Sequence, residues 1–201
     1  MVAGGPALGG SVEDLSAGLD SALAQRANAG YSRQLRDSGA NRVDGGKPEV
    51  TIVPGIAVAD PMAAAQRIAR GVARALDRQG WRSLQEFTLA NGRRADVMAV
   101  DPRGRFLIVE IKTSVQDFRA DRKWREYLDY CDLFLFAVPP AFPLALLPSE
   151  TGILVADAYD AATERAAYAC PPLAPARRRQ RLIEFARLSA DRLRRLVDPE
   201  M

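Results

Sequence analysis

Histidine is absent from this chain of 201 residues, and cysteine occurs only twice. The missing histidine excludes Ser-His-Asp and Cys-His catalysis, histidine-containing zinc sites and a histidine general base. Cys131 and Cys170 form no Cys-x-x-Cys pair, so they indicate neither a zinc site nor a disulfide framework, which favours a reducing compartment. Catalysis by carboxylates and metal ions remains after these exclusions.

Long apolar runs are also lacking. No segment approaches the roughly 20 apolar residues that are needed to cross a bilayer, and the N-terminus has no basic region followed by an apolar signal stretch. We therefore expect a soluble, cytoplasmic protein without a membrane partner.

Large apolar residues are scarce in residues 1–58, which are rich in Gly, Ala, Ser and Asp. This composition predicts a mostly disordered N-terminal extension. Residues 59–201 have the composition of one domain with its own core. Residues 1–60 carry five basic and seven acidic side chains, whereas residues 61–201 carry 23 basic and 18 acidic ones. The positive charge therefore belongs to the part that is expected to fold.

A β-hairpin is predicted in the middle of this domain. Residues 101–104, Asp-Pro-Arg-Gly, supply turn chemistry between two runs of β-branched and aliphatic residues, 95–100 and 106–112. If residues 102–104 form a three-residue loop, Asp101 lies opposite Arg105. The same register, counted back along both strands, places an aspartate of the first strand opposite a glutamate of the second.

These two acids are Asp96 and Glu110, whose Cβ atoms would lie roughly 4.5 to 5.5 Å apart. Lys112 shares the face of Glu110, because side chains alternate along a strand. A one-residue change of register would separate the three side chains. The pattern thus predicts two carboxylates and one ammonium group on one face of a sheet, although a plain surface pairing of Glu110 with Lys112 would use the same residues.

Opposed carboxylates are unfavourable unless a cation bridges them, and Mg²⁺ takes oxygen ligands of this kind. We therefore expect Asp96 and Glu110 to hold Mg²⁺ or Mn²⁺, with the backbone carbonyl of Ile111 completing the coordination. Metal-assisted hydrolysis of a phosphodiester fits this site. Lys112 would position or activate the attacking water, or stabilise charge at phosphorus. Of the 28 basic residues only three are lysines, so a lysine is an unusual choice at this position.

At Asp96 and Glu110-Ile111-Lys112 the sequence resembles the PD-(D/E)xK nuclease superfamily. Longer stretches, within about 61–195, resemble its MmcB-like DNA-repair branch: 92–96, 109–114, 117–124 and 130–139. The resemblance implies an α/β, restriction-endonuclease-like core with a mixed central β-sheet flanked by helices. It also implies a nucleoid-associated DNA-repair nuclease, acting on DNA and with other DNA-repair proteins. Unlike many members of the superfamily, the chain has no Glu in the helix expected before the hairpin.

Glu86 is a third candidate ligand, and its role depends on the preceding turn. A loop of residues 90–92 would place Glu86 opposite Asp96, whereas a two-residue loop of Asn91 and Gly92 would turn it to the other face. Both readings remain open from the sequence.

Alternating helical and strand patterns fill the rest of the domain. Asp60 caps a helix that Gly80 ends, and in the C-terminal helix Leu182, Ala186, Leu193 and Leu196 are expected to pack inward. The predicted helices are 60–80, 117–130 and 176–197, and the predicted strands are 83–89, 94–100, 106–112, 133–138 and 153–155.

Basic side chains on these elements are candidates for phosphate contacts, although exposed arginines are often only solvated. The C-terminal helix carries eight arginines, which suit either phosphate binding or an amphipathic capping helix. The candidates for DNA binding are Arg70, Arg94, Arg119 and Lys123.

The expected function is therefore metal-dependent hydrolysis of DNA, and the resemblance implies that the protein is an endonuclease. A catalytically inactive protein of the same fold that binds DNA or a repair partner is the alternative. A protein-interaction module that uses the N-terminal segment and the C-terminal helix is the third. The sequence leaves the preferred DNA structure and the oligomeric state open.

Overall fold

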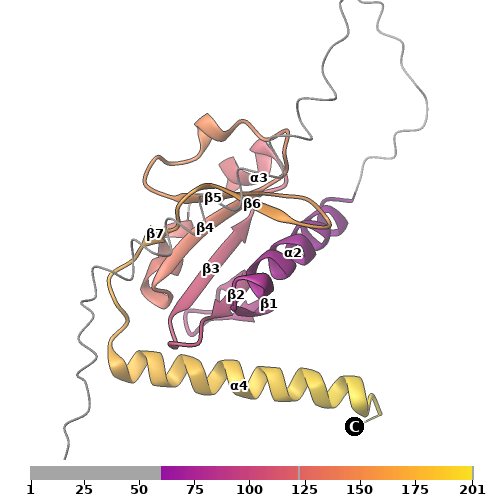
Figure 1. The fold of residues 1–201 in the computed structure, drawn as a ribbon, viewed down its shortest axis with the longest axis vertical. Coiled ribbons are helices and arrows are strands. Elements are labelled where there is room, and N and C mark those ends of the chain that lie inside the picture. Colours follow the sequence, from indigo (N-terminus) through magenta and orange to yellow (C-terminus); the bar gives the residue numbers. More distant parts are fainter. Residues whose placement is uncertain (1–59, 122, 201) are drawn as a thin grey trace, which may run out of the picture. The chain divides into compact units, whose positions relative to one another are not determined.

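The computed structural model describes residues 60–121 and 123–200. They form an α/β fold around a seven-stranded mixed sheet in the order β1-β2-β3-β4-β5-β6, with β7 paired to β4 (Figure 1). This architecture confirms the expected fold class and is consistent with a restriction-endonuclease-like core. The predicted disordered extension, 1–58, lies outside the described residues.

The helices and strands follow the predicted alternation of patterns. The helical elements are α2 (Pro61–Arg78), α3 (Val115–Ala120), the 3₁₀ helices η1 (Trp124–Tyr130) and η2 (Leu144–Leu146), and α4 (Pro175–Val197). The strands are β1 (Arg82–Thr88), β2 (Arg94–Val100), β3 (Phe106–Ile111), β4 (Leu133–Val138), β5 (Gly152–Ala156), β6 (Ala161–Arg165) and β7 (Tyr168–Ala169). The sequence patterns did not predict β6 and β7. In the described part of the chain no helix is long and apolar enough to cross a membrane.

Helix α2 covers one face of the sheet. Its N-terminus is capped by Asp60, whose Oδ1 accepts a hydrogen bond of 3.0 Å from the backbone N–H of Met62. Buried residues of α2, including Val72, pack on odd-numbered strand residues such as Val97 and Val109. The even-numbered residues of β2 and β3 therefore face away from α2.

The β2–β3 hairpin has the register that places Asp96 beside Glu110. Asp101 N–H donates to the carbonyl of Arg105 at 3.1 Å, which closes the predicted three-residue loop. In the β2–β3 ladder Val97 pairs with Val109, and the next residues toward the open end are Asp96 and Glu110. Strand β3 then pairs in parallel with the buried strand β4.

The single helix predicted over 117–130 is wrong. The chain forms α3, breaks, and continues as η1. The break is at Asp121, whose Oδ1 accepts a hydrogen bond of 3.0 Å from the N–H of Lys123. This local turn replaces the next helical hydrogen bond and leaves the other carboxylate oxygen of Asp121 free to reach the sheet.

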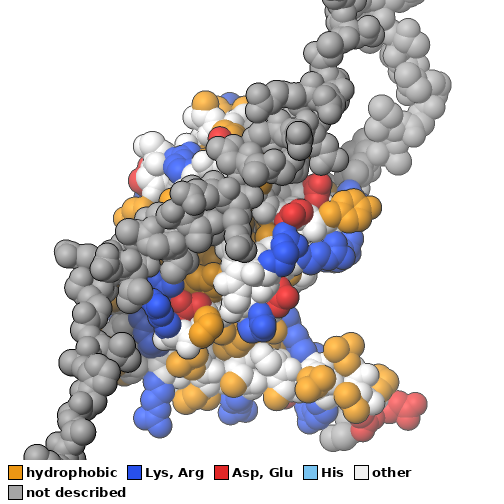
Figure 2. All heavy atoms as spheres, in the orientation of Figure 1, with side chains coloured by type: hydrophobic (Ala, Val, Ile, Leu, Met, Phe, Trp, Pro, Cys, Tyr) orange, Lys and Arg blue, Asp and Glu red, His pale blue; other side chains and the backbone are white. Residues whose placement is uncertain are grey.

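The predicted inward face of α4 is also wrong. Leu182, Leu193 and Leu196 are 39%, 62% and 82% exposed, and Ala186 is exposed as well. Phe185 faces the sheet instead, with its ring centroid 6.2 Å from that of Phe87. Along α4, apolar and basic side chains consequently lie next to one another on the surface (Figure 2).

Polar contacts set this rotation of α4. Arg178 donates two hydrogen bonds of 2.7 Å to the carboxylate of Asp132, which directly precedes β4. The guanidinium of Arg181 lies over the ring of Tyr130, 5.3 Å from its centroid. Arg178 and Arg181 thus lie on the inward face of α4, where the hydrophobic pattern predicts apolar residues.

Candidate active site on strands β2 and β3

Asp96, Glu110 and Lys112 converge on the sheet face that α2 leaves uncovered. Asp96 belongs to β2, Glu110 to β3, and Lys112 directly follows β3. Glu110 and Lys112 are only 3% and 5% exposed, which is rare for charged residues that lack partners. The predicted register therefore brings the three predicted residues together.

Backbone hydrogen bonds hold the two carboxylates in place. The N–H of Asp96 donates to Oε1 of Glu110 at 3.3 Å, and the N–H of Ile111 donates to Oδ2 of Asp96 at 2.8 Å. Each acid is thus tied to the neighbouring strand through one oxygen. The second oxygen of each carboxylate makes no backbone hydrogen bond of this kind.

The Lys112 ammonium is held by acids from two elements. Its Nζ lies 2.6 Å from Oδ2 of Asp121 and 3.8 Å from Oε2 of Glu110. Burial lowers the pKa of Lys112, but the hydrogen bond with Asp121 and the charge of Glu110 raise it more, so the net shift is upward. Burial raises the pKa of Asp121, yet the hydrogen bonds from Lys112 and from the Lys123 backbone lower it overall. Lys112 and Asp121 are therefore a charged pair.

The two carboxylates, by contrast, resist being charged together. Burial and the nearby charge of Asp96 hold the pKa of Glu110 well above its ordinary value. Burial also raises the pKa of Asp96, although the hydrogen bond from Ile111 and the charge of Lys112 partly oppose it. A divalent cation between the two acids would remove this penalty.

The residues present fit a hard cation with few protein ligands. Mg²⁺ is commonly held by one or two carboxylates and keeps several waters or phosphate oxygens, and Asp96 and Glu110 supply two such groups. The described residues contain no group of three or more His, Cys, Asp or Glu that could hold a metal. Remaining ligands would have to come from water, phosphate or a backbone carbonyl such as that of Ile111.

Glu86 occupies the position opposite Asp96 but is not drawn into the site. The turn closes as a loop of residues 90–92, since the N–H of Leu89 donates to the carbonyl of Arg93. The β1–β2 pairing is interrupted at Glu86, which has a φ of 55°, a strained value for a residue other than glycine. Its carboxylate is 53% exposed and pairs with Arg94 at 2.6 Å.

Asp121, Asp117 and Tyr127 complete the surroundings of the site. Asp117 Oδ2 accepts a hydrogen bond of 3.0 Å from the N–H of Thr113, which orders the turn after Lys112. Tyr127 is buried, and its hydroxyl donates to the carbonyl of Arg94 at 3.2 Å. Burial and the nearby carboxylates raise the pKa of Tyr127, so its phenol stays protonated.

Of the predicted DNA-binding residues, three adjoin the site and one does not. Arg94 precedes Asp96 by two residues, and Arg119 and Lys123 flank Asp121 at the same spacing; all three are exposed. Arg70 belongs to α2, on the opposite side of the sheet from the acidic pair. These positions favour a basic rim of Arg94, Arg119 and Lys123 around the site.

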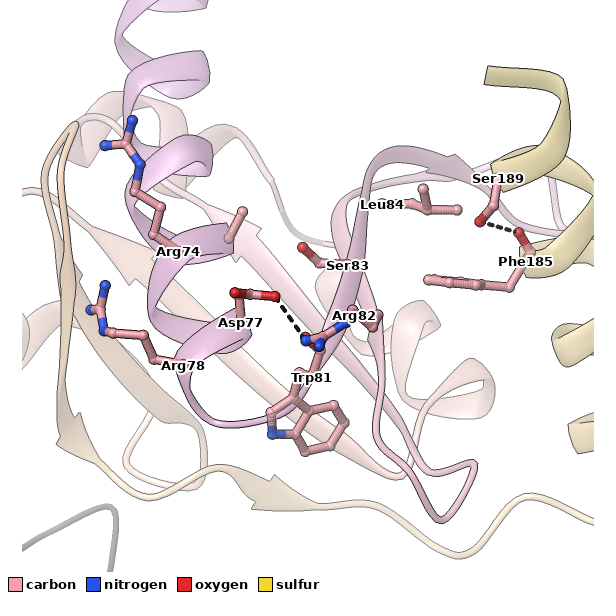
Figure 3. A pocket seen from close by; sticks show the side chains of 10 residues that line it. Arg74, Asp77, Arg78, Trp81, Arg82, Ser83, Leu84, Phe185 and Ser189 are labelled. Atoms are coloured by element: carbon pink, nitrogen blue, oxygen red, sulfur yellow. Dashed lines mark hydrogen bonds and ion pairs between the residues drawn. The ribbon is translucent and has the colours of Figure 1, made fainter. Parts of the chain in front are cut away.

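A groove of about 520 Å³ lies elsewhere, between α2, β1 and α4 (Figure 3). Its arginines are already engaged: Arg82 pairs with Asp77 at 2.7 Å, and Arg78 pairs with Asp160. None of the residues that line the groove belongs to the acidic cluster. The groove is therefore separate from the candidate site.

Comparison with known proteins identifies the family. The family described as DNA repair protein MmcB-like matches residues 57–200. A solved structure, the SPO1766 protein of unknown function from Silicibacter pomeroyi, is 49% identical with a TM-score of 0.66, and the match covers 68% of this chain and 93% of that one. No curated protein matches the chain significantly. Because the family match spans most of the sequence and includes the whole candidate site, the chain belongs to the MmcB-like family of DNA repair proteins.

Proposed function

We propose that this protein is a DNA-repair nuclease of the PD-(D/E)xK type, which hydrolyses DNA phosphodiester bonds with Mg²⁺ or Mn²⁺. The observation that carries the proposal is the convergence of buried Asp96, Glu110 and Lys112 on one face of the sheet. Buried charged groups without a structural partner of equal and opposite charge are costly. Their concentration at one place is typical of a catalytic site.

In this proposal the acids and the lysine have different roles. Asp96 and Glu110 would hold the cation through the oxygens that make no backbone hydrogen bond. When bound, the cation would polarise a phosphoryl oxygen and lower the pKa of a coordinated water. Lys112, kept protonated by Asp121, would orient the attacking water and stabilise negative charge that develops at phosphorus.

The basic rim supports DNA as the substrate. Arg94, Arg119 and Lys123 are exposed and adjoin the residues that surround Lys112, where they would contact phosphates on either side of the cleaved bond. Such contacts are independent of base sequence. This surface therefore favours recognition of a DNA structure over recognition of a base sequence.

A second candidate is a DNA-binding or partner-binding protein without catalysis. The observation that favours it is the charged pair of Lys112 and Asp121 at 2.6 Å, together with the absence, among the described residues, of a group of three or more His, Cys, Asp or Glu that could hold a metal. A lysine fully engaged by Asp121 would contribute to stability rather than to chemistry.

Cleavage of a panel of labelled DNA separates the two candidates. Duplex, single-stranded, nicked and branched substrates are incubated with Mg²⁺ or Mn²⁺ and with the wild type, Asp96→Asn, Glu110→Gln or Lys112→Met. The matched control is Glu164→Gln, which changes an exposed glutamate of β6. We expect cleavage by the wild type and the control, and a loss of at least about 100-fold in the three site variants. DNA binding without cleavage, unchanged in the site variants, would favour the second candidate.

A further inference from the structure

The two cysteines of the chain meet in the fold although they are 39 residues apart in sequence. Their Sγ atoms lie 3.6 Å from each other, and both are free thiols. Cys131 is fully buried, and Cys170 is 7% exposed. Since a disulfide bond is about 2.05 Å long, the sulfur atoms have to approach by only about 1.5 Å.

The backbone places the two residues at the ends of neighbouring strands, Cys131 before β4 and Cys170 directly after β7. Strands β4 and β7 are antiparallel, with Leu133 paired to Ala169. One step beyond this pair, the N–H of Cys170 donates to the carbonyl of Asp132 at 2.9 Å. Cys131 directly precedes Asp132 in the chain, so this backbone hydrogen bond holds Cys170 next to Cys131.

The two thiols differ in reactivity. The hydrogen bond between the two thiols lowers the pKa of Cys170, whereas the same hydrogen bond and burial raise the pKa of Cys131. Cys170 is also the more exposed of the two. A thiolate is the reactive form of cysteine, so an oxidant that reaches the pair would react with Cys170 first.

We propose that Cys131 and Cys170 are a modification site that hydrogen peroxide oxidises to an intramolecular disulfide. In the first step the Cys170 sulfur attacks the terminal peroxide oxygen, the O–O bond breaks, and a sulfenic acid forms with release of water. In the second step the Cys131 sulfur attacks the Cys170 sulfur and a second water leaves. Together the two thiols lose two electrons and two protons, and one molecule of hydrogen peroxide is reduced to two waters.

This disulfide would fasten α4 to the sheet. Residues 170–174 lead from β7 into α4, and the N–H of Leu173 points to Oδ1 of Asp132 at 3.5 Å. Arg178 anchors the first turn of α4 to the same carboxylate. A covalent bond from Cys170 to Cys131 would add a second anchor beside Asp132 for the segment that leads into α4.

Peroxide titration of the full chain tests the proposal. The folded protein is treated with hydrogen peroxide, quenched, unfolded in the presence of an alkylating reagent, and analysed by intact mass and by peptide mapping. We expect the loss of two hydrogen atoms, no alkylation of either cysteine, and a peptide that joins Cys131 to Cys170. Reduction should restore both thiols.

Variants provide the control for the pathway. Cys131→Ser, if folded by circular dichroism, should stop at a sulfenic acid or higher oxide on Cys170, and Cys170→Ser should leave Cys131 at least about tenfold less reactive than the wild-type pair. Hydrogen exchange of the α4 amides should slow in the oxidised wild type. Thiols that stay reduced while unfolded protein is oxidised, a higher oxide on wild-type Cys170 beside a free Cys131, or disulfides between chains would each overturn the proposal.

Discussion

Asp121 accepts a hydrogen bond of 2.6 Å from the ammonium group of Lys112, although the two residues belong to different elements. Asp121 ends α3, and its own backbone turn toward Lys123 aims the carboxylate at the end of β3. The Asp121 carboxylate thus forms the turn that ends the helix and also keeps Lys112 charged.

Substitution of Asp121 should change the pH dependence of cleavage. In Asp121→Asn the hydrogen bond that the Lys112 ammonium donates to a charged carboxylate is lost, so burial lowers the pKa of Lys112. If the protonated lysine is the active form, the activity of the variant falls at a lower pH than that of the wild type, and its rate at neutral pH drops about tenfold, or about 1.4 kcal/mol. Single-turnover rates between acidic and alkaline pH measure this. An alkaline limb at the same pH in both proteins would assign Asp121 a purely structural role.

Glu110→Gln should stabilise the metal-free protein at neutral and alkaline pH. The folded-state pKa of Glu110 lies well above its ordinary value of 4.5, so the folded state keeps a proton that the unfolded state releases. Stability is then fully present below pH 4.5 and is lost as the pH rises through the folded-state pKa. The amide cannot ionise, and the variant escapes this loss.

Thermal unfolding in a chelator measures the difference between wild type and Glu110→Gln at several pH values. The melting temperatures should diverge as the pH rises, and Glu164→Gln should follow the wild type throughout. A Glu110→Gln variant that is less stable than the wild type at alkaline pH would contradict the raised pKa of Glu110.

Arg178→Ala should destabilise the fold by about 2 kcal/mol. The Asp132 carboxylate also accepts a hydrogen bond of 2.7 Å from the N–H of Phe106, and without Arg178 it would be a mostly buried charge with no cation beside it. Urea unfolding provides the measurement. Arg177→Ala, at an exposed neighbouring position, is the matched control and should change the stability by less than about 0.5 kcal/mol. Equal effects of the two substitutions would contradict the anchoring role of Arg178.

The affinity for DNA should depend on salt through the basic rim. Each phosphate contact contributes about 0.9 to the slope of log affinity against log salt, because binding releases counterions. An Arg119→Ala and Lys123→Ala double variant should therefore reduce this slope by about 1.8 on duplex DNA. Arg70→Ala, on the other side of the sheet, should leave the slope unchanged. Affinity that does not vary with salt in the wild type would count against direct DNA binding.

The hairpin that carries the site was predictable because its determinants are local. The turn at residues 101–104 sets the register of β2 and β3, and alternation then decides which side chains share a face. The observed pairing of Val97 with Val109 follows this register. Asp96, Glu110 and Lys112 could therefore be placed together from the sequence.

Features that depend on distant partners were not predictable. The break at Asp121 depends on a lysine of the sheet, and the rotation of α4 depends on Asp132 and Tyr130. The hydrophobic pattern of α4 contains no information on these contacts. The approach of Cys131 to Cys170 likewise arises from β7, a strand of two residues that no pattern indicates.

Titration with Mn²⁺, followed by electron paramagnetic resonance of the free ion, tests the central claim most directly, because it needs no knowledge of the DNA substrate. We expect saturable binding to the wild type and to Glu164→Gln, a loss of at least about tenfold in affinity in Asp96→Asn and Glu110→Gln, and tighter binding as the pH rises and Glu110 loses its proton. No saturable binding to the wild type, or equal binding to Glu110→Gln, would contradict a cation site between Asp96 and Glu110.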